Sequence, residues 1–348
     1  MKRKDERPDR KAVWEGNYDK DHLLGNYADI LIADSSVKDF VSRGASGGVG
    51  TTLLWYLLSQ KEVDLVIGVG FSASDPTVPA YRVIGNPDHI TELSGSKYVY
   101  MEVGPLIKLL EDSKDKKTAV FVQPCHIKAM RRYQKTRYPQ LKYIFSFFCG
   151  YNIEYQATDY LIKKTNIPKP SIAKLSYRGG DYPGGFEVTT FTGAVKSFGK
   201  ECFELVDLMF LRKGCKICPL YAGEGADIIL GDAWIKGEKN KTIVMIRSPN
   251  LTQKLNELER LNFLATYQIK ESDLVKMHWH NFSFKKYGLK PLIQLLQSIF
   301  SSSLVIRIAP FRLLTSVSRI RRQLSIGIPI QLKKRMVQDE FPRKSDDL

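Results

Sequence analysis

The sequence predicts an α/β protein with a largely parallel sheet and flanking helices, followed by an α+β C-terminal portion and a basic helical tail. Three observations carry this prediction. Short apolar runs alternate with amphipathic stretches between residues 41 and 167. Glycine-separated short strands follow Pro168-Lys169-Pro170, and Lys and Arg accumulate near the end of the chain. Strands that alternate with helices favour a parallel sheet, whereas closely spaced short strands favour hairpins.

The α/β portion is predicted over residues 41–167, after a polar lead-in over residues 1–40 that has no strong hydrophobic period. Leu53, Leu54, Leu57 and Leu58 recur at helical spacing, which predicts a helix over residues 49–60. The other elements alternate in order: strands at 63–69, 118–122 and 141–148, and helices at 102–113, 127–137 and 154–165.

The α+β portion is predicted over residues 168–275. Its glycines, at Gly179-Gly180, Gly184-Gly185 and Gly193, separate short apolar runs in the manner of hairpins. The predicted strands are 172–177, 186–191, 194–198, 226–231 and 242–247.

Residues 276–348 are predicted to form a basic amphipathic tail. Residues 281–348 contain 13 Lys or Arg against 4 Asp or Glu, which accounts for more than half of the net charge of +16. The longest uncharged run, Pro291–Ile306, is shorter than the about 20 apolar residues that a membrane-spanning helix needs. We expect the tail either to lie on an anionic membrane surface or to pack on the catalytic body or a second subunit. Nucleic acid is not expected as a partner, because the charges alternate with Leu and Ile rather than with stacking aromatics.

The N-terminus and the cysteine content indicate a reducing compartment. The chain opens Met1-Lys2-Arg3-Lys4 without an apolar stretch, which argues against secretion. We therefore expect a cytoplasmic protein, with association at the inner membrane face through the tail as an alternative. In such a compartment, grouped cysteines are more often metal ligands or redox groups than disulfides.

Four of the five cysteines form a candidate ligand set. Cys215 and Cys218 make a Cys-x-x-Cys pair, a spacing that serves zinc, iron–sulfur or dithiol chemistry. Cys125 and Cys149 each follow a predicted strand, at the sheet edge where α/β proteins place their sites. Four thiolates suit a 4Fe-4S cluster; the alternative is that Cys125 and Cys149 are ordinary buried cysteines. Cys202, within a predicted helix, is assigned a structural role.

A glycine-rich loop, residues 44–50, immediately precedes the first predicted helix. A Walker-type phosphate loop requires Lys before Thr51, where Gly50 stands, and the Rossmann fingerprint fails at Leu53. Two interpretations remain open. The loop either binds a diphosphate or flavin phosphate at the helix N-terminus, or is a flexible N-cap that uses Ser46.

Further candidates lie in polar loops. Lys97 and Tyr98, in Gly95-Ser96-Lys97-Tyr98, offer a positive charge and a stacking surface, although the segment alone is equally consistent with a surface loop. Asp232 ends a predicted strand and is either a site residue or an N-cap. His126 is the one His near a candidate site, so Lys97 and His126 are the candidate catalytic residues.

Taken together, these segments resemble the beta-subunit family of coenzyme F420-reducing hydrogenases and dehydrogenases, over roughly residues 22–250. The matching segments, in chain order, are Leu24-Gly25-Asn26-Tyr27, Ser46-Gly47-Gly48 with Thr51, Val63-Asp64, Gly95-Ser96-Lys97-Tyr98, Pro124-Cys125, Cys149, Tyr177-Arg178, Cys215 with Cys218, and Ala226-Asp227-Ile228 leading to Gly231-Asp232 and Trp234.

The resemblance implies a flavin-dependent oxidoreductase with one 4Fe-4S cluster. It implies FAD in the 41–167 portion and exchange of electrons between a reduced carrier (F420, a nicotinamide or ferredoxin) and an organic substrate. A sugar or lipid-linked intermediate of polysaccharide biosynthesis is one such substrate. The implied cluster ligands are Cys125, Cys149, Cys215 and Cys218, and the implied cofactor-binding residues are Ser46, Gly47, Gly48, Thr51, Ser96, Lys97, Tyr98 and Asp232.

Three departures from the family pattern bear on this expectation. Val122-Gln123 precedes Pro124 where a Gly is usual, and His126 stands in place of a usual Gln. No cysteine precedes Cys125, so the ferredoxin-like module of many relatives is missing. We therefore expect a separate electron donor, either a ferredoxin-like protein or a diffusing reduced coenzyme, F420 or NAD(P)H. The alternative function is a non-catalytic cluster-binding scaffold at a membrane surface.

Overall fold

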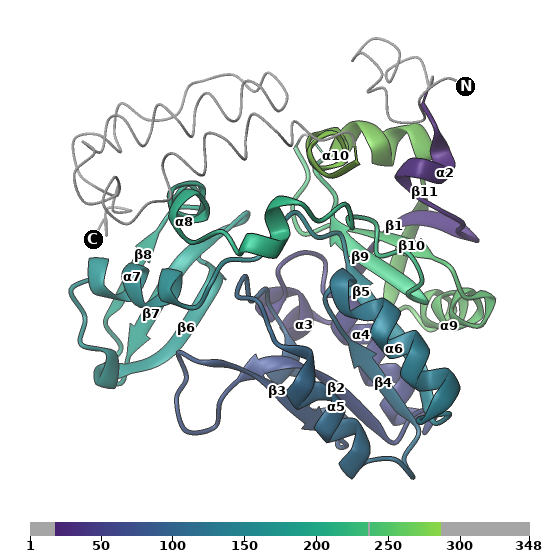
Figure 1. Cartoon of the computed structure of the whole chain (residues 1–348), viewed down its shortest axis with the longest axis horizontal. Coiled ribbons are helices and arrows are strands. Elements are labelled where there is room, and N and C mark those ends of the chain that lie inside the picture. The colour runs from purple at the N-terminus through teal and green to yellow at the C-terminus, as the bar shows by residue number, and fades with distance from the viewer. Residues whose placement is uncertain (1–17, 236, 287–348) are drawn as a thin grey trace.

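The larger of two sheets is an eight-stranded mixed sheet with the strand order β11-β1-β10-β9-β5-β4-β2-β3 (Figure 1). The computed structural model of the chain describes residues 18–235 and 237–286. Four adjacent strands are parallel, namely β2 (Leu65–Phe71), β4 (Thr118–Phe121), β5 (Leu141–Phe147) and β9 (Ile228–Asp232). The outer strands pair antiparallel: β3 (Pro79–Ile84) at one edge, and β10 (Thr242–Ile246), β1 (Asp29–Ser35) and β11 (Leu264–Gln268) at the other. The predicted α/β class is thus confirmed, with a parallel centre and antiparallel edges.

Helices cover both faces of this sheet. Alternate residues of β1 show the division, since Ile30 and Ile32 join one buried cluster while Leu31 and Ala33 join the other. The first cluster is covered by α2 (Lys20–Leu23), α5 (Val103–Asp112), α6 (Pro124–Thr136) and α10 (Glu271–Lys286). The second cluster is covered by α3 (Lys38–Arg43), α4 (Val49–Ser59), η1 (Pro87–Leu93) and α9 (Pro249–Arg260).

The smaller sheet is an antiparallel meander with its own core. Its strands are β6 (Ile172–Gly179), β7 (Gly185–Thr190) and β8 (Val195–Phe198), with α7 (Gln156–Lys164), η2 (Lys169–Ser171), α8 (Cys202–Phe210) and η3 (Lys213–Lys216) around it (Figure 1). The hairpin prediction for residues 172–198 is confirmed. Cys202 lies fully buried in this third cluster, which agrees with its assigned structural role.

The observed organisation of the chain differs from the predicted domain bounds at three places. The lead-in over residues 1–40 contains α2, β1 and the start of α3, and β1 lies inside the larger sheet. Strands β9, β10 and β11, predicted with the α+β portion, also belong to the larger sheet. Residues 276–286 of the predicted tail continue helix α10, and the rest of the tail lies outside the described residues. The physical reason for the first difference is that β1 has a short apolar run, Ile30–Ala33, flanked by Asp29 and Asp34.

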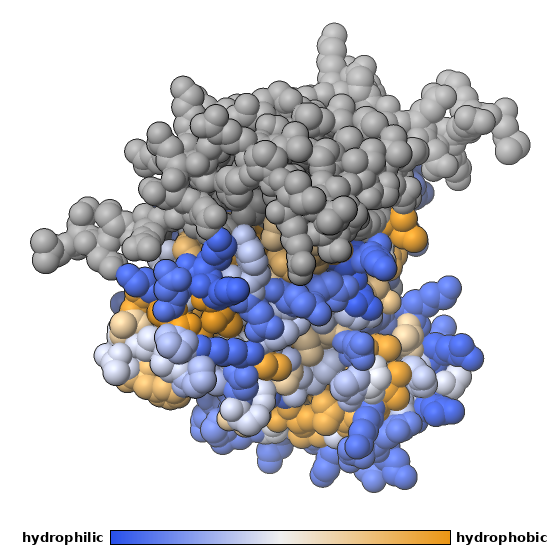
Figure 2. All heavy atoms as spheres, turned by 60° about the vertical axis from the view of Figure 1, so that its left-hand side comes forward, coloured by the Kyte–Doolittle hydropathy of each residue, from blue (hydrophilic) through white to orange (hydrophobic). Residues whose placement is uncertain are grey.

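The described surface mixes polar and apolar side chains. Figure 2 shows hydrophilic side chains interspersed with smaller hydrophobic areas on one face. The most exposed large apolar side chains belong to separate elements, including Phe191 after β7 and Ile217 beyond η3. Of the helices in the described ranges, not one has the length and apolar character needed to cross a membrane.

Candidate cofactor site

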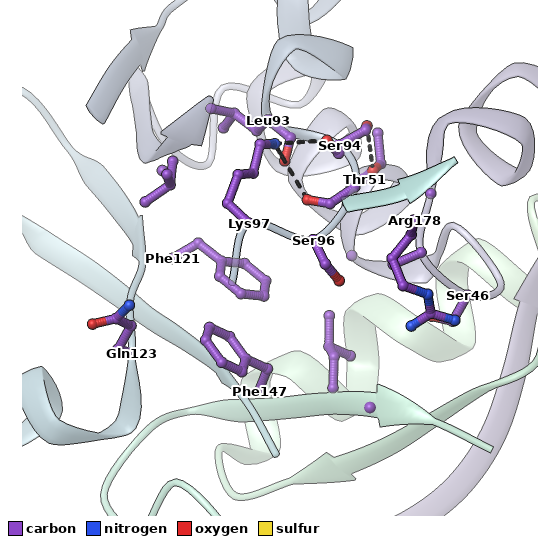
Figure 3. Close-up of a pocket in the computed structure, with 18 of the residues that line it drawn as sticks. Ser46, Thr51, Leu93, Ser94, Ser96, Lys97, Phe121, Gln123, Phe147 and Arg178 are labelled. Atoms are coloured by element: carbon purple, nitrogen blue, oxygen red, sulfur yellow. Dashed lines mark hydrogen bonds between the residues drawn. The ribbon is translucent and has the colours of Figure 1, made fainter. Parts of the chain in front are cut away.

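A cavity of about 310 Å³ lies at the carboxyl ends of the parallel strands (Figure 3). Parallel strands end at one common edge, which is where open α/β sheets bind ligands. The cavity is bounded on the opposite side by the N-terminus of α4, the segment after η1, and Arg178 from β6. The residues contributed by the strand ends are Gly68, Val69, Phe121, Val122, Phe147, Phe148, Leu230, Gly231 and Asp232.

The glycine-rich loop is fixed by contacts with the edge strands. The Gly47 N–H donates to Thr242 Oγ1 at 2.9 Å, and the Gly47 carbonyl accepts from the Ser35 N–H at 2.7 Å. A Cβ on Gly47 would lie 2.7 Å from the Asn240 carbonyl oxygen and 2.9 Å from that of Ala33. Gly47 therefore lets the loop dock on β1 and β10 and does not itself line the cavity.

The first turn of α4 forms part of the cavity wall. Gly48, Val49, Gly50 and Thr51 all line the cavity, and Gly48 is the N-cap with a left-handed φ of 71°. No side chain caps α4; Ser46 lines the cavity but bonds Thr242 Oγ1 at 2.9 Å. The first-turn N–H groups of α4 are thus left without a side-chain acceptor, and a helix N-terminus of this kind favours an anion.

Lys97 lines the cavity with its ammonium turned back toward the end of η1. Its Nζ donates to the carbonyl oxygens of Leu93 at 3.1 Å, Ser94 at 2.7 Å and Gly95 at 3.2 Å (Figure 3). Burial lowers the pKa of Lys97 to about 7, so its charge changes near neutral pH. Thr51 is joined to the same segment, because its Oγ1 lies 2.9 Å from Ser94 Oγ.

The aromatic residues of the cavity divide into two groups. Tyr98 lines the cavity, but its ring makes edge contacts with Phe203 at 4.8 Å and Tyr177 at 5.9 Å between centroids. It therefore anchors the smaller core to the cavity wall. Phe121 and Phe147, which were not predicted as site residues, stack on each other at 6.0 Å and provide the apolar floor (Figure 3).

Arg178 is the principal cavity residue that was not assigned a role from the sequence. Its Nη1 donates to Asp232 Oδ2 at 2.8 Å and its Nε to the Pro183 carbonyl oxygen at 2.5 Å, while Nη2 is buried without a hydrogen-bond partner among the described residues. Its side chain is only 5% exposed, and its guanidinium also interacts with the side chain of Tyr98. Figure 3 shows the guanidinium on the same side of the cavity as Ser46 and Ser96. Because a buried unsatisfied donor is costly, this Nη2 indicates a place for an acceptor on a ligand.

The four candidate ligand cysteines gather beside this cavity. Cys149 lies in its wall, in the loop that leaves β5, whereas Cys125 opens α6 and Cys215 and Cys218 lie in and after η3. Asn152 links two of them, since its backbone N–H donates to Cys215 Sγ at 3.4 Å and its Nδ2 to Cys149 Sγ at 3.6 Å. Thiolate ligands of iron–sulfur clusters accept hydrogen bonds from N–H donors of this kind.

The four thiols act on one another's pKa values. Cys125 is an exposed residue, but partial desolvation of its thiol and then the charges of Cys218 and Cys215 raise its pKa to about 11. Burial raises the pKa of Cys149 to about 12, and the other three thiols add to that increase. Within the described ranges, no group of three or more His, Cys, Asp or Glu side chains could hold a metal ion. A 4Fe-4S cluster requires a wider arrangement of ligands than a single metal ion does, because each thiolate binds its own iron atom. The four cysteines are free thiols, so they supply the number and type of donor that such a cluster needs.

His126 lies on the cysteine side and does not line the cavity. Its Nε2 is 3.4 Å from the Tyr100 hydroxyl, and its buried Nδ1 has no hydrogen-bond partner in the described residues. Burial, followed by the charge of Arg212, lowers the pKa of His126 to about 4. The ring is therefore neutral at physiological pH and does not carry a proton to donate as an imidazolium.

The comparisons with known proteins agree with this fold. Residues 30–108 match the N-terminal family model, and residues 115–272 the C-terminal family model, of the coenzyme F420 hydrogenase/dehydrogenase beta subunit. The chain belongs to this family. The predicted resemblance is thereby confirmed, and the relatives support an oxidoreductase.

Individual relatives are distant. The coenzyme F420 hydrogenase subunit beta of Methanococcus voltae is 25% identical over 71% of this chain and 86% of the relative. The coenzyme F420-dependent sulfite reductase of Methanocaldococcus jannaschii is also 25% identical, over 66% of this chain but 39% of the relative. A chain from the F420-reducing [NiFe] hydrogenase complex of Methanosarcina barkeri has the same fold, with a TM-score of 0.61 at 21% identity over 79% of this chain and 93% of that chain.

Proposed function

We propose that this chain binds one FAD in the cavity and one 4Fe-4S cluster on Cys125, Cys149, Cys215 and Cys218. The observation that carries the proposal is the double position of Cys149, which lies in the cavity wall and shares Asn152 with Cys215 as a hydrogen-bond donor to its sulfur atom. A flavin bound there would convert a hydride into single electrons, and the adjacent cluster would accept or supply them one at a time.

The protein's own groups supply the binding surface for the flavin. The first turn of α4 and the free Nη2 of Arg178 offer donors for the diphosphate. Phe121 and Phe147 offer apolar surface for a ring system. The cavity volume of about 310 Å³ is at the lower end of the about 300–1,000 Å³ that is typical of small-molecule sites.

Several polar residues are proposed to tune the two cofactors. Asn152 would orient Cys149 and Cys215 by its hydrogen bonds to their sulfur atoms. Asp232 holds Arg178 in place through their ion pair. Of the two candidate catalytic residues, Lys97 lines the cavity and is proposed to lie near the flavin. His126 lies outside the cavity lining and is proposed to lie near the cluster.

The proposed reaction is electron exchange between a reduced carrier and an organic substrate. The relatives are named for coenzyme F420, so reduced F420 is the first carrier to test, followed by NAD(P)H and a ferredoxin. The basic C-terminal region favours an anionic or lipid-linked substrate, such as an intermediate of polysaccharide biosynthesis.

The test is the iron and flavin content of the full chain purified without oxygen. We expect about four iron atoms per chain, one FAD, and absorption bands of both cofactors. Cys215→Ser should lose most of the iron because it removes a ligand, and Cys202→Ser, a matched change at a buried cysteine of the third cluster, should keep it.

Two results would contradict the proposal. Stoichiometric zinc without iron would rule out the cluster. A full iron complement without any bound flavin, even after FAD is added, would leave the scaffold function in its place.

A further inference from the structure

Helix α10 brings a lysine to the cysteine side of the cavity. On this helix, Asn281 Nδ2 donates to the Tyr221 hydroxyl at 3.2 Å, and a Cβ on Gly150 would lie 3.2 Å from Asn281 Oδ1. The Tyr221 carbonyl oxygen in turn accepts from the Cys149 N–H at 3.1 Å. Lys285 follows Asn281 by four residues, so both lie on the helix face that packs against the Cys149 loop.

Lys285 is buried without an acidic partner. Its exposure is 2%, and among the described residues it forms no ion pair with a carboxylate. Burying a lone ammonium is costly, and such a group is normally paired. The neighbouring Lys286, by contrast, is paired with Glu224. A missing counter-charge at Lys285 indicates an anion that binds nearby.

The groups on which the charge of Lys285 acts are the candidate cluster ligands. Burial raises the pKa values of Cys125, Cys149 and Cys215, and the positive charge of Lys285 acts in the opposite direction on all three. Arg212 also acts on Cys215, but it is 33% exposed, pairs with Glu154 at 3.3 Å and lies 3.4 Å over the Tyr100 ring. Solvent and Glu154 therefore screen the charge of Arg212 more than that of Lys285, whose exposure is 2%.

We propose that Lys285 is the buried counter-charge of the iron–sulfur cluster and raises its reduction potential, an inference that rests on the cluster of the proposed function. Reduction adds one electron, supplied by the proposed flavin, to a cluster that already carries four thiolates. No bond is broken and no proton is needed, so the net charge becomes more negative by one. A fixed buried cation stabilises the more negative state and thus favours reduction.

This residue lies outside the segments that match the family models. The C-terminal family model ends at residue 272, before most of α10. Lys285 is therefore a feature of this chain that the family match does not include, and it would set the potential of this cluster independently of the four ligands.

The experiment is a redox titration of the full chain, purified without oxygen, with the reduced cluster followed by electron paramagnetic resonance. Lys285→Met removes the charge and keeps the length, and Lys285→Arg keeps the charge. We expect the Met variant to disfavour reduction about tenfold or more, which is 59 mV or more toward negative potential for a one-electron couple. The Arg variant should stay near the wild type, and so should Lys286→Met, the matched change at the paired neighbour.

An unchanged potential in Lys285→Met with full iron content overturns the inference and leaves the proposed function intact. If Lys285→Met loses iron, Lys285→Gln and Lys285→Arg are compared. Iron retained only by the Arg variant supports the counter-charge, and iron lost by all three overturns it. A wild-type chain without an iron–sulfur cluster overturns the proposed function itself.

Discussion

The two ends of the cavity present different chemical groups, backbone at one end and reactive side chains at the other. At the α4 end, the wall is made of backbone: the first turn of the helix, a loop docked through Gly47, and a lysine held by three carbonyl oxygens. At the cysteine end, Cys149 and Asn152 line the cavity, and the other three candidate ligand cysteines and the buried Lys285 lie outside its lining. The α4 end would bind its cofactor through backbone groups that the fold holds in place, and the cysteine end would bind its cofactor through the chemistry of particular side chains. Substitutions at one end should therefore change flavin content while iron content stays constant, and the reverse should hold at the other end.

The largest effect at the α4 end is expected for Arg178→Met. This change removes the free Nη2 donor and leaves Asp232 without its ion-pair partner. A hydrogen bond to a charged group contributes about 1.5–3 kcal/mol, so FAD affinity should fall about tenfold to a hundredfold. Titration of flavin-free protein with FAD, followed by flavin fluorescence, measures the loss.

A matched substitution separates this role from general destabilisation. Arg131 also forms an ion pair with an aspartate, Asp227 at 2.7 Å, but does not line the cavity. Arg131→Met should therefore retain FAD affinity. Equal loss of affinity in both variants, or loss of iron together with flavin in Arg178→Met, would break the distinction between the two ends.

A smaller effect is expected for Gly47→Val. The new side chain would meet the backbone oxygens of Asn240 and Ala33, so the loop must move away from β1 and β10. We expect the free energy of unfolding to fall by about 1–3 kcal/mol and FAD binding to weaken because the first turn of α4 shifts. Thermal unfolding and FAD titration measure the two changes.

The control for this loop is Gly104→Val, at a glycine where an added Cβ meets nothing within 4 Å. It should change FAD affinity little. If Gly47→Val binds FAD as the wild type does, the loop is only a turn that connects β1 to α4.

These two ends also explain what the sequence could predict. The cysteine end was predictable because Cys125 and Cys149 follow strands β4 and β5, and parallel strands bring their ends together. The thiol side chain limits the chemistry further. Gly47 was assigned to phosphate contact, whereas its contacts with β1 and β10 depend on sheet order that the local sequence does not contain.

The features that the sequence did not predict depend on long-range pairing. Strand β1 pairs with β10 and β11, which lie near the other end of the described chain. Arg178 meets Asp232 only because the smaller sheet is placed beside the end of β9. Lys285 sits in the segment predicted as the start of a basic tail, where a charge count gave no sign that one lysine is buried.

The smallest effect is expected for the pH dependence contributed by Lys97. Because burial lowers the pKa of Lys97 to about 7, the ammonium is charged below that pH and neutral above it. FAD phosphates are anionic throughout this range, so FAD affinity should fall as the pH rises from about 6 to about 8. We expect a change of only about twofold to fivefold, because the ammonium points toward three carbonyl oxygens rather than into the cavity. Lys97→Met should abolish the pH dependence, and Lys142→Met, at an exposed position on β5, should keep it. An identical pH profile in Lys97→Met and the wild type would show that the charge of Lys97 does not act on the flavin.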